Sequence, residues 1–156
     1  MDVMGLSLKS TKNKTVPEPG LPERSAVLEQ GPRRYRARVN RAPVLDPLRV
    51  QELAGNIHSQ SRLLEFLNLF LVLLPSRVNN VVGALDGGDL EAASAAAQSL
   101  ASSAAMAGAS RLELVALLVD SDLRIGRMDR ARETGQRLGP DAAELASALS
   151  RLLTGR

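Results

Sequence analysis

The chain contains no cysteine and no tryptophan, and it has one histidine, one tyrosine and two phenylalanines. Without cysteine it cannot form disulfides, bind a metal through thiolates or use a thiol nucleophile. This composition fits a reducing compartment, and we expect the protein in the cytoplasm. A single histidine excludes a site built from several imidazoles, so we expect no metal and no other cofactor. With aromatic residues at 2%, the core must consist of leucine, valine and alanine, which favours packed helices.

The sequence also lacks the motifs of common enzymes. It has no P-loop, no dinucleotide-binding glycine pattern and no Ser, His and Asp set at a diagnostic spacing. Asp120 and Asp122 are close in sequence, but residues two positions apart point to different sides of a helix. We therefore interpret them as a solvated edge without an acid–base role. We expect the protein not to be an enzyme.

No apolar run is long enough to span a membrane. The longest extends from Leu63 to Leu74, contains two polar residues and is followed by Pro75. Because a membrane span needs about 20 apolar residues, this run predicts a buried core helix. Residues 1–15 also lack the apolar stretch of a signal peptide. We expect no interaction with membranes.

Residues 1–43 are predicted to be a disordered, basic, proline-rich arm. They hold five of the eight prolines and show little apolar periodicity. Residues 1–44 carry nine basic and four acidic side chains, whereas residues 45–156 carry eleven and thirteen. Residues 33–41 contain five arginines and Tyr35, a patch that could bind nucleic acid. One aromatic side chain is little for base stacking, so a solubilising leader is the favoured interpretation.

Residues 44–156 are predicted to form a helical bundle. Asp46 and Pro47 suit the N-cap and first position of a short helix. The capping-box pattern from Ser110 to Glu113 predicts another helix start, and Gly139-Pro140 predicts a helix end. Further helices are expected at about 61–85, 88–109, 110–126, 128–138 and 141–152, and no segment alternates as a strand would. The expected fold is all-α: an up-down four-helix bundle with a short capping helix, preceded by the disordered arm.

The stretch from Gly88 to Ala109 organises the bundle, because its composition is strongly helical and no proline interrupts it. One face is apolar and consists of Leu90, Ala93, Ala97, Leu100 and Ala104. The opposite face is polar and consists of Glu91, Ser94, Gln98 and Ser102. This periodicity predicts that Gln98 faces outward in the middle of the helix.

The same stretch resembles the central helix of the histidine phosphotransfer (HPt) family. That helix usually reads Gly-Asp, eight residues, and then His-Ser/Thr-Leu-Lys-Gly-Ser, with a second Gly-Ala after it. Without a gap, the matching positions are Gly88-Asp89, Ser99-Leu100, Ser103 and Gly108-Ala109. The residues that carry the chemistry differ: the phosphoacceptor histidine is replaced by Gln98, the lysine by Ala101 and the first glycine by Ser102.

The resemblance implies a protein of a bacterial two-component phosphorelay. It implies as partner a response-regulator receiver domain or a histidine kinase, bound without acceptance of phosphate. Gln98, Ala101 and Ser102 would lie in the partner face. Val72 and Leu73 would lie near it, at positions where the family commonly has acidic residues. Val72 shares the polar face of its helix, so we expect it to be exposed and to bind a partner or a second copy of the chain.

Three alternatives remain open. Residues 88–93 and 126–131 resemble each other, as in a tetratricopeptide-like scaffold, although the period of 38 differs from the usual value of about 34 and the aromatic signature is missing. The second alternative is a nucleic-acid-binding protein that acts through the basic arm. His58 could be a displaced phosphoacceptor or general base, but it has no Asp or Ser partner at a diagnostic spacing. It is interpreted as a surface residue at a helix junction.

Overall fold

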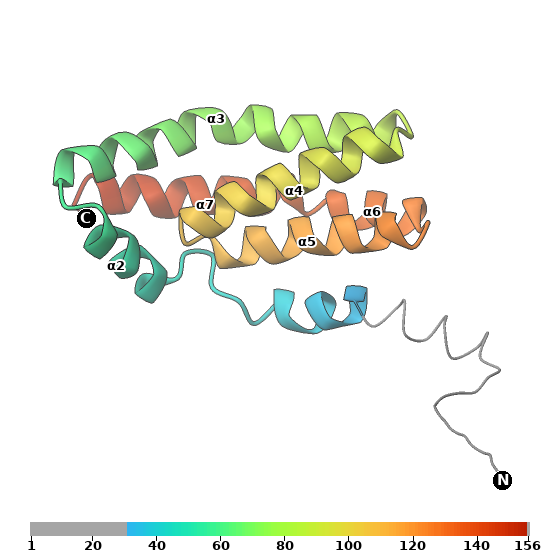
Figure 1. Ribbon diagram of the computed structural model, residues 1–156, viewed down its shortest axis with the longest axis horizontal. Coiled ribbons are helices and arrows are strands. Elements are labelled where there is room, and N and C mark those ends of the chain that lie inside the picture. Colours follow the sequence, from blue (N-terminus) through green and yellow to red (C-terminus); the bar gives the residue numbers. More distant parts are fainter. Residues whose placement is uncertain (1–30, 156) are drawn as a thin grey trace, which may run out of the picture. The chain divides into compact units, whose positions relative to one another are not determined.

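The computed structural model describes residues 31–155, and the part of the predicted arm in residues 1–30 lies outside the described residues. Residues 31–39 form a helix. The following helices are α2 (Pro47–Asn56), α3 (Gln60–Asp86), α4 (Leu90–Met106), α5 (Ser110–Arg124), α6 (Met128–Gly135) and α7 (Leu138–Leu153). The described residues contain no strand. The expected all-α class is confirmed (Figure 1).

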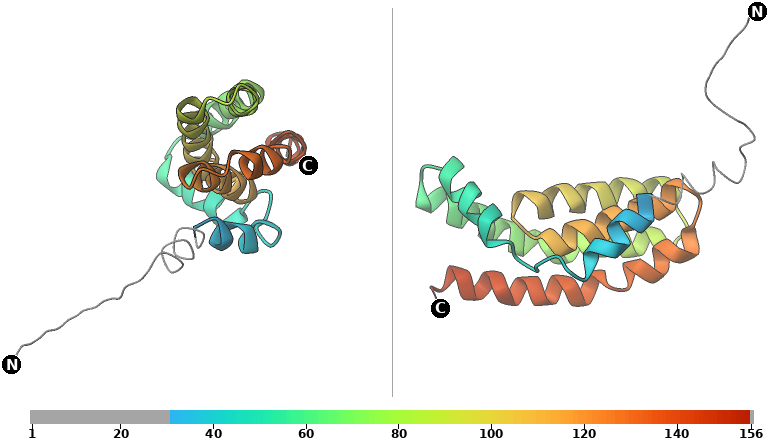
Figure 2. Two further views of the ribbon diagram at one scale, coloured as in Figure 1. Left: turned by 90° about the vertical axis from the view of Figure 1, so that its right-hand side faces the viewer. Right: turned by 90° about the horizontal axis from the view of Figure 1, so that it is seen from below.

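Four helical segments run alternately up and down around one core. The first three are α3, α4 and α5, and the fourth consists of α6 and α7, which lie end to end (Figures 1 and 2). The core contains leucine, valine and alanine with a single phenylalanine, Phe70. Ala93, Ala97 and Ala104 are fully buried on α4, where small side chains let the neighbouring helices approach closely. The up-down bundle is therefore built as the composition predicts.

The helix of residues 31–39 packs on the bundle. Val39 is 1% exposed and belongs to the hydrophobic core. Arg36 Nη2 lies 3.4 Å from Asp122 Oδ2 on α5, and Arg111 Nε donates to the Ala42 carbonyl at 3.0 Å. The prediction of a disordered arm is therefore wrong for residues 31–43. Pro43 lies beyond the last residue of the helix and does not interrupt it, and burial of Val39 stabilises the segment.

Two predicted helix boundaries have different outcomes. Asp46 caps α2 as expected, since its Oδ1 accepts a hydrogen bond from the Leu48 amide at 3.0 Å. The predicted capping box at the start of α5 does not form, because α5 has no side-chain cap. Instead, Arg49 of α2 donates to Ser110 Oγ at 3.1 Å and to Glu113 Oε1 at 2.7 Å. The two polar side chains thus fix α2 to α5.

The boundary before α7 was also predicted incorrectly. Gly139 and Pro140 lie inside the first turn of α7, and the break between α6 and α7 is the turn at residues 136–137. Proline is compatible with a first turn, where its missing N–H costs no internal hydrogen bond. Asp141 follows in the same turn and is buried. Desolvation raises the pKa of this carboxyl, and the nearby Arg137 lowers it to a smaller extent.

Helix α3 crosses the whole bundle. It has 27 residues, against 17 in α4 and 15 in α5. These unequal lengths favour a bundle over stacked helix pairs of a tetratricopeptide-like scaffold. By length and composition alone, α3 is the one described helix that could cross a membrane, a property shared with core helices. Its apolar stripe, including Leu67, Leu74 and Val81, is buried against the other helices.

Candidate functional site

A groove of about 550 Å³ lies between α4 and α5. We call it the Gln98 groove, and it brings together three of the predicted site residues, Gln98, Ala101 and Ser102. The remaining lining residues come from α4, from α5 and from the helix of residues 31–39; they are Ala105, Glu113, Leu117, Asp120, Ser121, Arg124 and Tyr35. On α4 the lining positions recur at three- and four-residue steps, so they share one helix face.

The Gln98 side chain is held by a hydrogen-bonded carboxylate. Gln98 Nε2 donates to Ser94 Oγ at 3.2 Å and approaches Asp120 Oδ1 at 3.5 Å. The Ser94 hydroxyl donates to the same Asp120 oxygen at 2.5 Å, and Arg124 Nε donates to Asp120 Oδ2 at 2.8 Å. The amide NH₂ of Gln98 thus lies toward Asp120, where it can donate to a carboxylate oxygen. The amide oxygen of Gln98 then faces away from Asp120.

The interpretation of Asp120 and Asp122 as a solvated edge is wrong. Asp120 is 6% exposed and Asp122 is 0% exposed. The two side chains do point in different directions, as their spacing predicts, but each direction leads to another helix. Asp120 bonds to Ser94 on α4, and Asp122 pairs with Arg36 in the helix of residues 31–39. Neither partner could be assigned from the sequence, where only the four-residue spacing of Asp120 and Arg124 signals a pair.

The other two predicted groove residues differ in exposure. Ala101 is 4% exposed at the floor of the groove, whereas Ser102 is exposed. Among the described residues that line this groove, Arg124 carries the one positive charge. Arg124, Asp120 and Tyr35 were not predicted to lie beside Gln98, because they come from elements distant from it in sequence.

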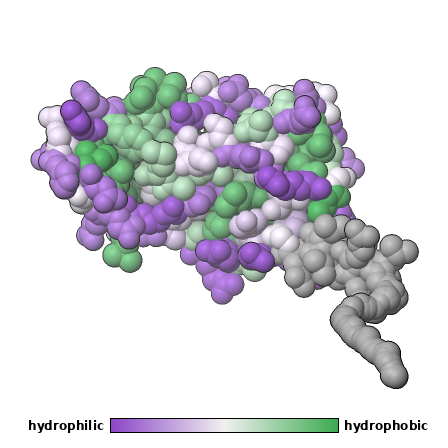
Figure 3. Space-filling view, in the orientation of Figure 1, coloured by the Kyte–Doolittle hydropathy of each residue, from purple (hydrophilic) through white to green (hydrophobic). Residues whose placement is uncertain are grey.

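Val72 and Leu73 do not line the Gln98 groove. The predicted exposure of Val72 is confirmed, since it is 73% exposed on α3. Leu73 is half-buried in a second groove of about 200 Å³ between α3 and α4, together with the exposed Leu69 and Met106. On the face shown in Figure 3, hydrophobic areas are separated by polar residues. The predicted partner face is therefore divided among at least two surfaces.

His58 is exposed in the short linker between α2 and α3 and does not line the Gln98 groove. In residues 31–155, no group of three or more histidine, cysteine, aspartate or glutamate side chains is arranged to hold a metal ion. The arrangement of the Gln98 groove suits binding through hydrogen bonds and apolar contact. Its central side chain is an amide, which has no nucleophilic nitrogen at neutral pH.

A family model and two solved structures that match this chain all concern the same kind of domain. A family model described as the Hpt domain matches residues 65–155. Histidine-containing phosphotransfer protein B from Pseudomonas aeruginosa PAO1 has a similar structure, with a TM-score of 0.67, 20% identity, and coverage of 74% of this chain and 98% of that chain. The HPT domain of a sensor hybrid histidine kinase from Shewanella has a TM-score of 0.61 and 19% identity, covering 72% and 96%. No curated protein matches the chain.

Proposed function

Because the chain belongs to the Hpt domain family, we propose that it binds a receiver domain of a bacterial two-component phosphorelay without accepting the phosphoryl group. Proteins of this family are phosphotransfer carriers rather than catalysts, and they interact with histidine kinases and response regulators. The proposed family domain spans residues 44–156, with residues 31–43 packed against it. The proposed location is the cytoplasm, as the absence of cysteine suggests.

The observation that carries this proposal is the absence of histidine from the matched residues. The chain has one histidine, His58, and the match to the family covers residues 65–155. In the resemblance described above, Gln98 takes the place of the phosphoacceptor. Its amide nitrogen has a lone pair delocalised into the carbonyl group, and that nitrogen is directed toward Asp120. It therefore cannot attack a phosphoryl group.

The groove also lacks the cation that the family places one turn further along the helix. Ala101 stands there and offers no charge to stabilise a developing phosphoryl transition state. Arg124 lies on the neighbouring helix, but its Nε is committed to Asp120. Loss of the nucleophile and loss of the cation act on the same step, so both support a binding protein without transfer activity.

A bundle that keeps the shape of its family can still bind the partner's docking surface. By docking on a receiver domain, the protein would compete with active phosphotransfer proteins or hold the receiver in one state. Gln98, Ala101 and Ser102 are the proposed centre of this contact, with Val72 and Leu73 at its margin. A histidine kinase or a second copy of the chain is the alternative partner for these residues.

Incubation with a ³²P-labelled phosphorylated receiver tests the proposal. The wild-type chain should bind the receiver in a pull-down and acquire no acid-labile phosphate. The variant Gln98→His, Ala101→Lys, Ser102→Gly should acquire some, because the long lysine side chain can extend from the buried position 101 into the groove. A His58→Ala control identifies any label on the native histidine. Label on the wild-type chain would refute the inactive assignment.

A further inference from the structure

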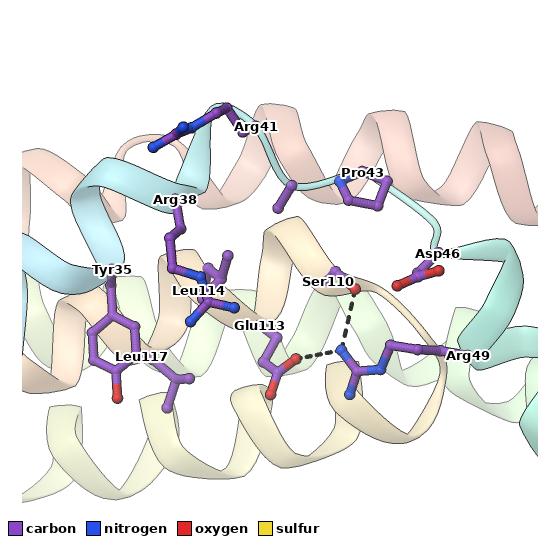
Figure 4. Close-up of a pocket in the computed structure, with 11 residues that line it drawn as sticks. Tyr35, Arg38, Arg41, Pro43, Asp46, Arg49, Ser110, Glu113, Leu114 and Leu117 are labelled. Atoms are coloured by element: carbon purple, nitrogen blue, oxygen red, sulfur yellow. Dashed lines mark hydrogen bonds and ion pairs between the residues drawn. The ribbon is translucent and has the colours of Figure 1, made fainter.

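A third groove, of about 540 Å³, runs between the helix of residues 31–39, α2 and α5. It is lined by Tyr35, Arg38, Arg41, Ala42, Pro43, Asp46, Arg49, Ser110, Glu113, Leu114 and Leu117 (Figure 4). We call it the Arg38 groove. Figure 4 shows the Arg38 side chain extending into this groove toward α5, with Arg41 at the edge. Much of it is built by residues outside the segment 65–155 that matches the family.

The charges in this groove do not balance. Three arginines and two carboxylates line the groove, and both carboxylates accept hydrogen bonds from groups other than Arg38. Glu113 Oε1 accepts from Arg49 Nη1 at 2.7 Å, and Asp46 Oδ1 caps α2. Arg49 is further held by Ser110 Oγ at 3.1 Å. Arg38 is exposed and forms no ion pair with either of these carboxylates, so its positive charge is available to a partner.

The Arg38 groove is continuous with the Gln98 groove. Tyr35, Glu113 and Leu117 line both of them, so the two hollows meet on the surface of α5. A partner centred on Gln98 and broader than one groove would extend across Tyr35 and reach the Arg38 guanidinium. The exposed positive charge of Arg38 therefore fits an acidic side chain on the part of the receiver that extends beyond the Gln98 groove.

We propose that Arg38, with Arg41 beside it, is a basic anchor for the acidic face of the receiver domain that docks on the Gln98 groove. This inference rests on the proposed function. It adds that the partner surface is acidic and that residues 31–43 help to select the partner. Complementary charges at the edge of an interface mainly accelerate association and select the partner. The anchor is supplied by residues 31–43, so it distinguishes this chain from an Hpt bundle that lacks such a segment.

Charge reversal tests the anchor in the chain of 156 residues. We expect Arg38→Glu to lower the association rate constant for the receiver about fivefold at low ionic strength. The difference from wild type should shrink as salt rises toward about 0.5 M, because exposed charges are screened. The Arg38 side chain is exposed and forms no ion pair with the carboxylates of the groove, so the thermal midpoint should change little. Surface plasmon resonance at several salt concentrations measures the rates.

Arg130→Glu is the matched control. Arg130 is exposed on α6, lines neither groove, and its reversal changes the net charge by the same amount. We expect it to bind the receiver nearly as wild type does. Equal association rates for Arg38→Glu and Arg130→Glu would overturn the anchor while leaving the proposed function intact. If the wild-type chain bound no receiver at all, the proposed function would fall and the anchor with it.

Discussion

Val39 tests whether residues 31–43 are part of the folded unit. The side chain is 1% exposed, so Val39→Ala removes two buried methyl groups. At about 0.8 kcal/mol for each group, plus a term for the small cavity, the expected loss of stability is about 2 kcal/mol. For a unit of this size, that loss corresponds to a fall of roughly 6–10 °C in the thermal midpoint. Urea unfolding and a thermal melt, both followed by circular dichroism at 222 nm, measure the two quantities.

Val72→Ala is the matched control, because it makes the same chemical change at a side chain that is 73% exposed. We expect it to change the free energy of unfolding by less than about 0.5 kcal/mol. Deletion of residues 1–40 should destabilise more than Val39→Ala, since it also removes the Arg36–Asp122 ion pair. Equal stability of the two alanine variants would refute the packing of this segment and restore the unpacked arm over residues 31–43.

Three further predictions concern the bundle and its surface. Gly135→Ala should cost about 1–3 kcal/mol, because the new Cβ would lie 2.7 Å from Leu85 Cδ1, whereas Gly139→Ala, with no atom within 4 Å, should not destabilise. Asp141→Asn should be more stable than wild type at neutral pH. Burial raises the folded-state pKa of Asp141 above the ordinary value of 3.8, so the wild-type protein loses stability as pH rises through the folded-state pKa. The advantage of asparagine should therefore grow as pH rises from below the ordinary aspartate pKa to neutral in urea titrations. Val72→Glu should weaken receiver binding without lowering the thermal midpoint, and unfolding of this variant would show that the side chain is needed for packing.

Much of the fold follows from local sequence patterns. The bounds expected for the long helix, residues 61–85, agree closely with Gln60–Asp86, because its apolar residues recur with helical period. The Asp46 cap and the Pro47 start were predicted from short-range chemistry and are present. Signals that depend on distant partners were misinterpreted. Ser110 and Glu113 match a capping box in sequence, yet they bind Arg49, which lies about sixty residues away.

In the candidate site, too, some features follow from local sequence patterns and others depend on contacts between distant segments. The helical phase of α4 placed Gln98 and Ser102 on the outer face, and both are exposed. The phase alone could not reveal Asp120 and Arg124, because a carboxylate on one helix meets an amide on another only after the helices have packed. Likewise, the separation of Val72 from the Gln98 groove depends on which sides of α3 and α4 face each other.

The sequence by itself determined the helical class, the bundle core of leucine, valine and alanine, and the absence of a histidine near the centre of the proposed site. These properties depend on local periodicity and on residue identity, which need no knowledge of distant contacts. The tertiary structure alone decided that residues 31–39 fold onto α5, that Asp122 is buried, and that two grooves join at Tyr35. Each of these depends on burial between segments far apart in the chain, where the free energy comes from packing that no local pattern encodes.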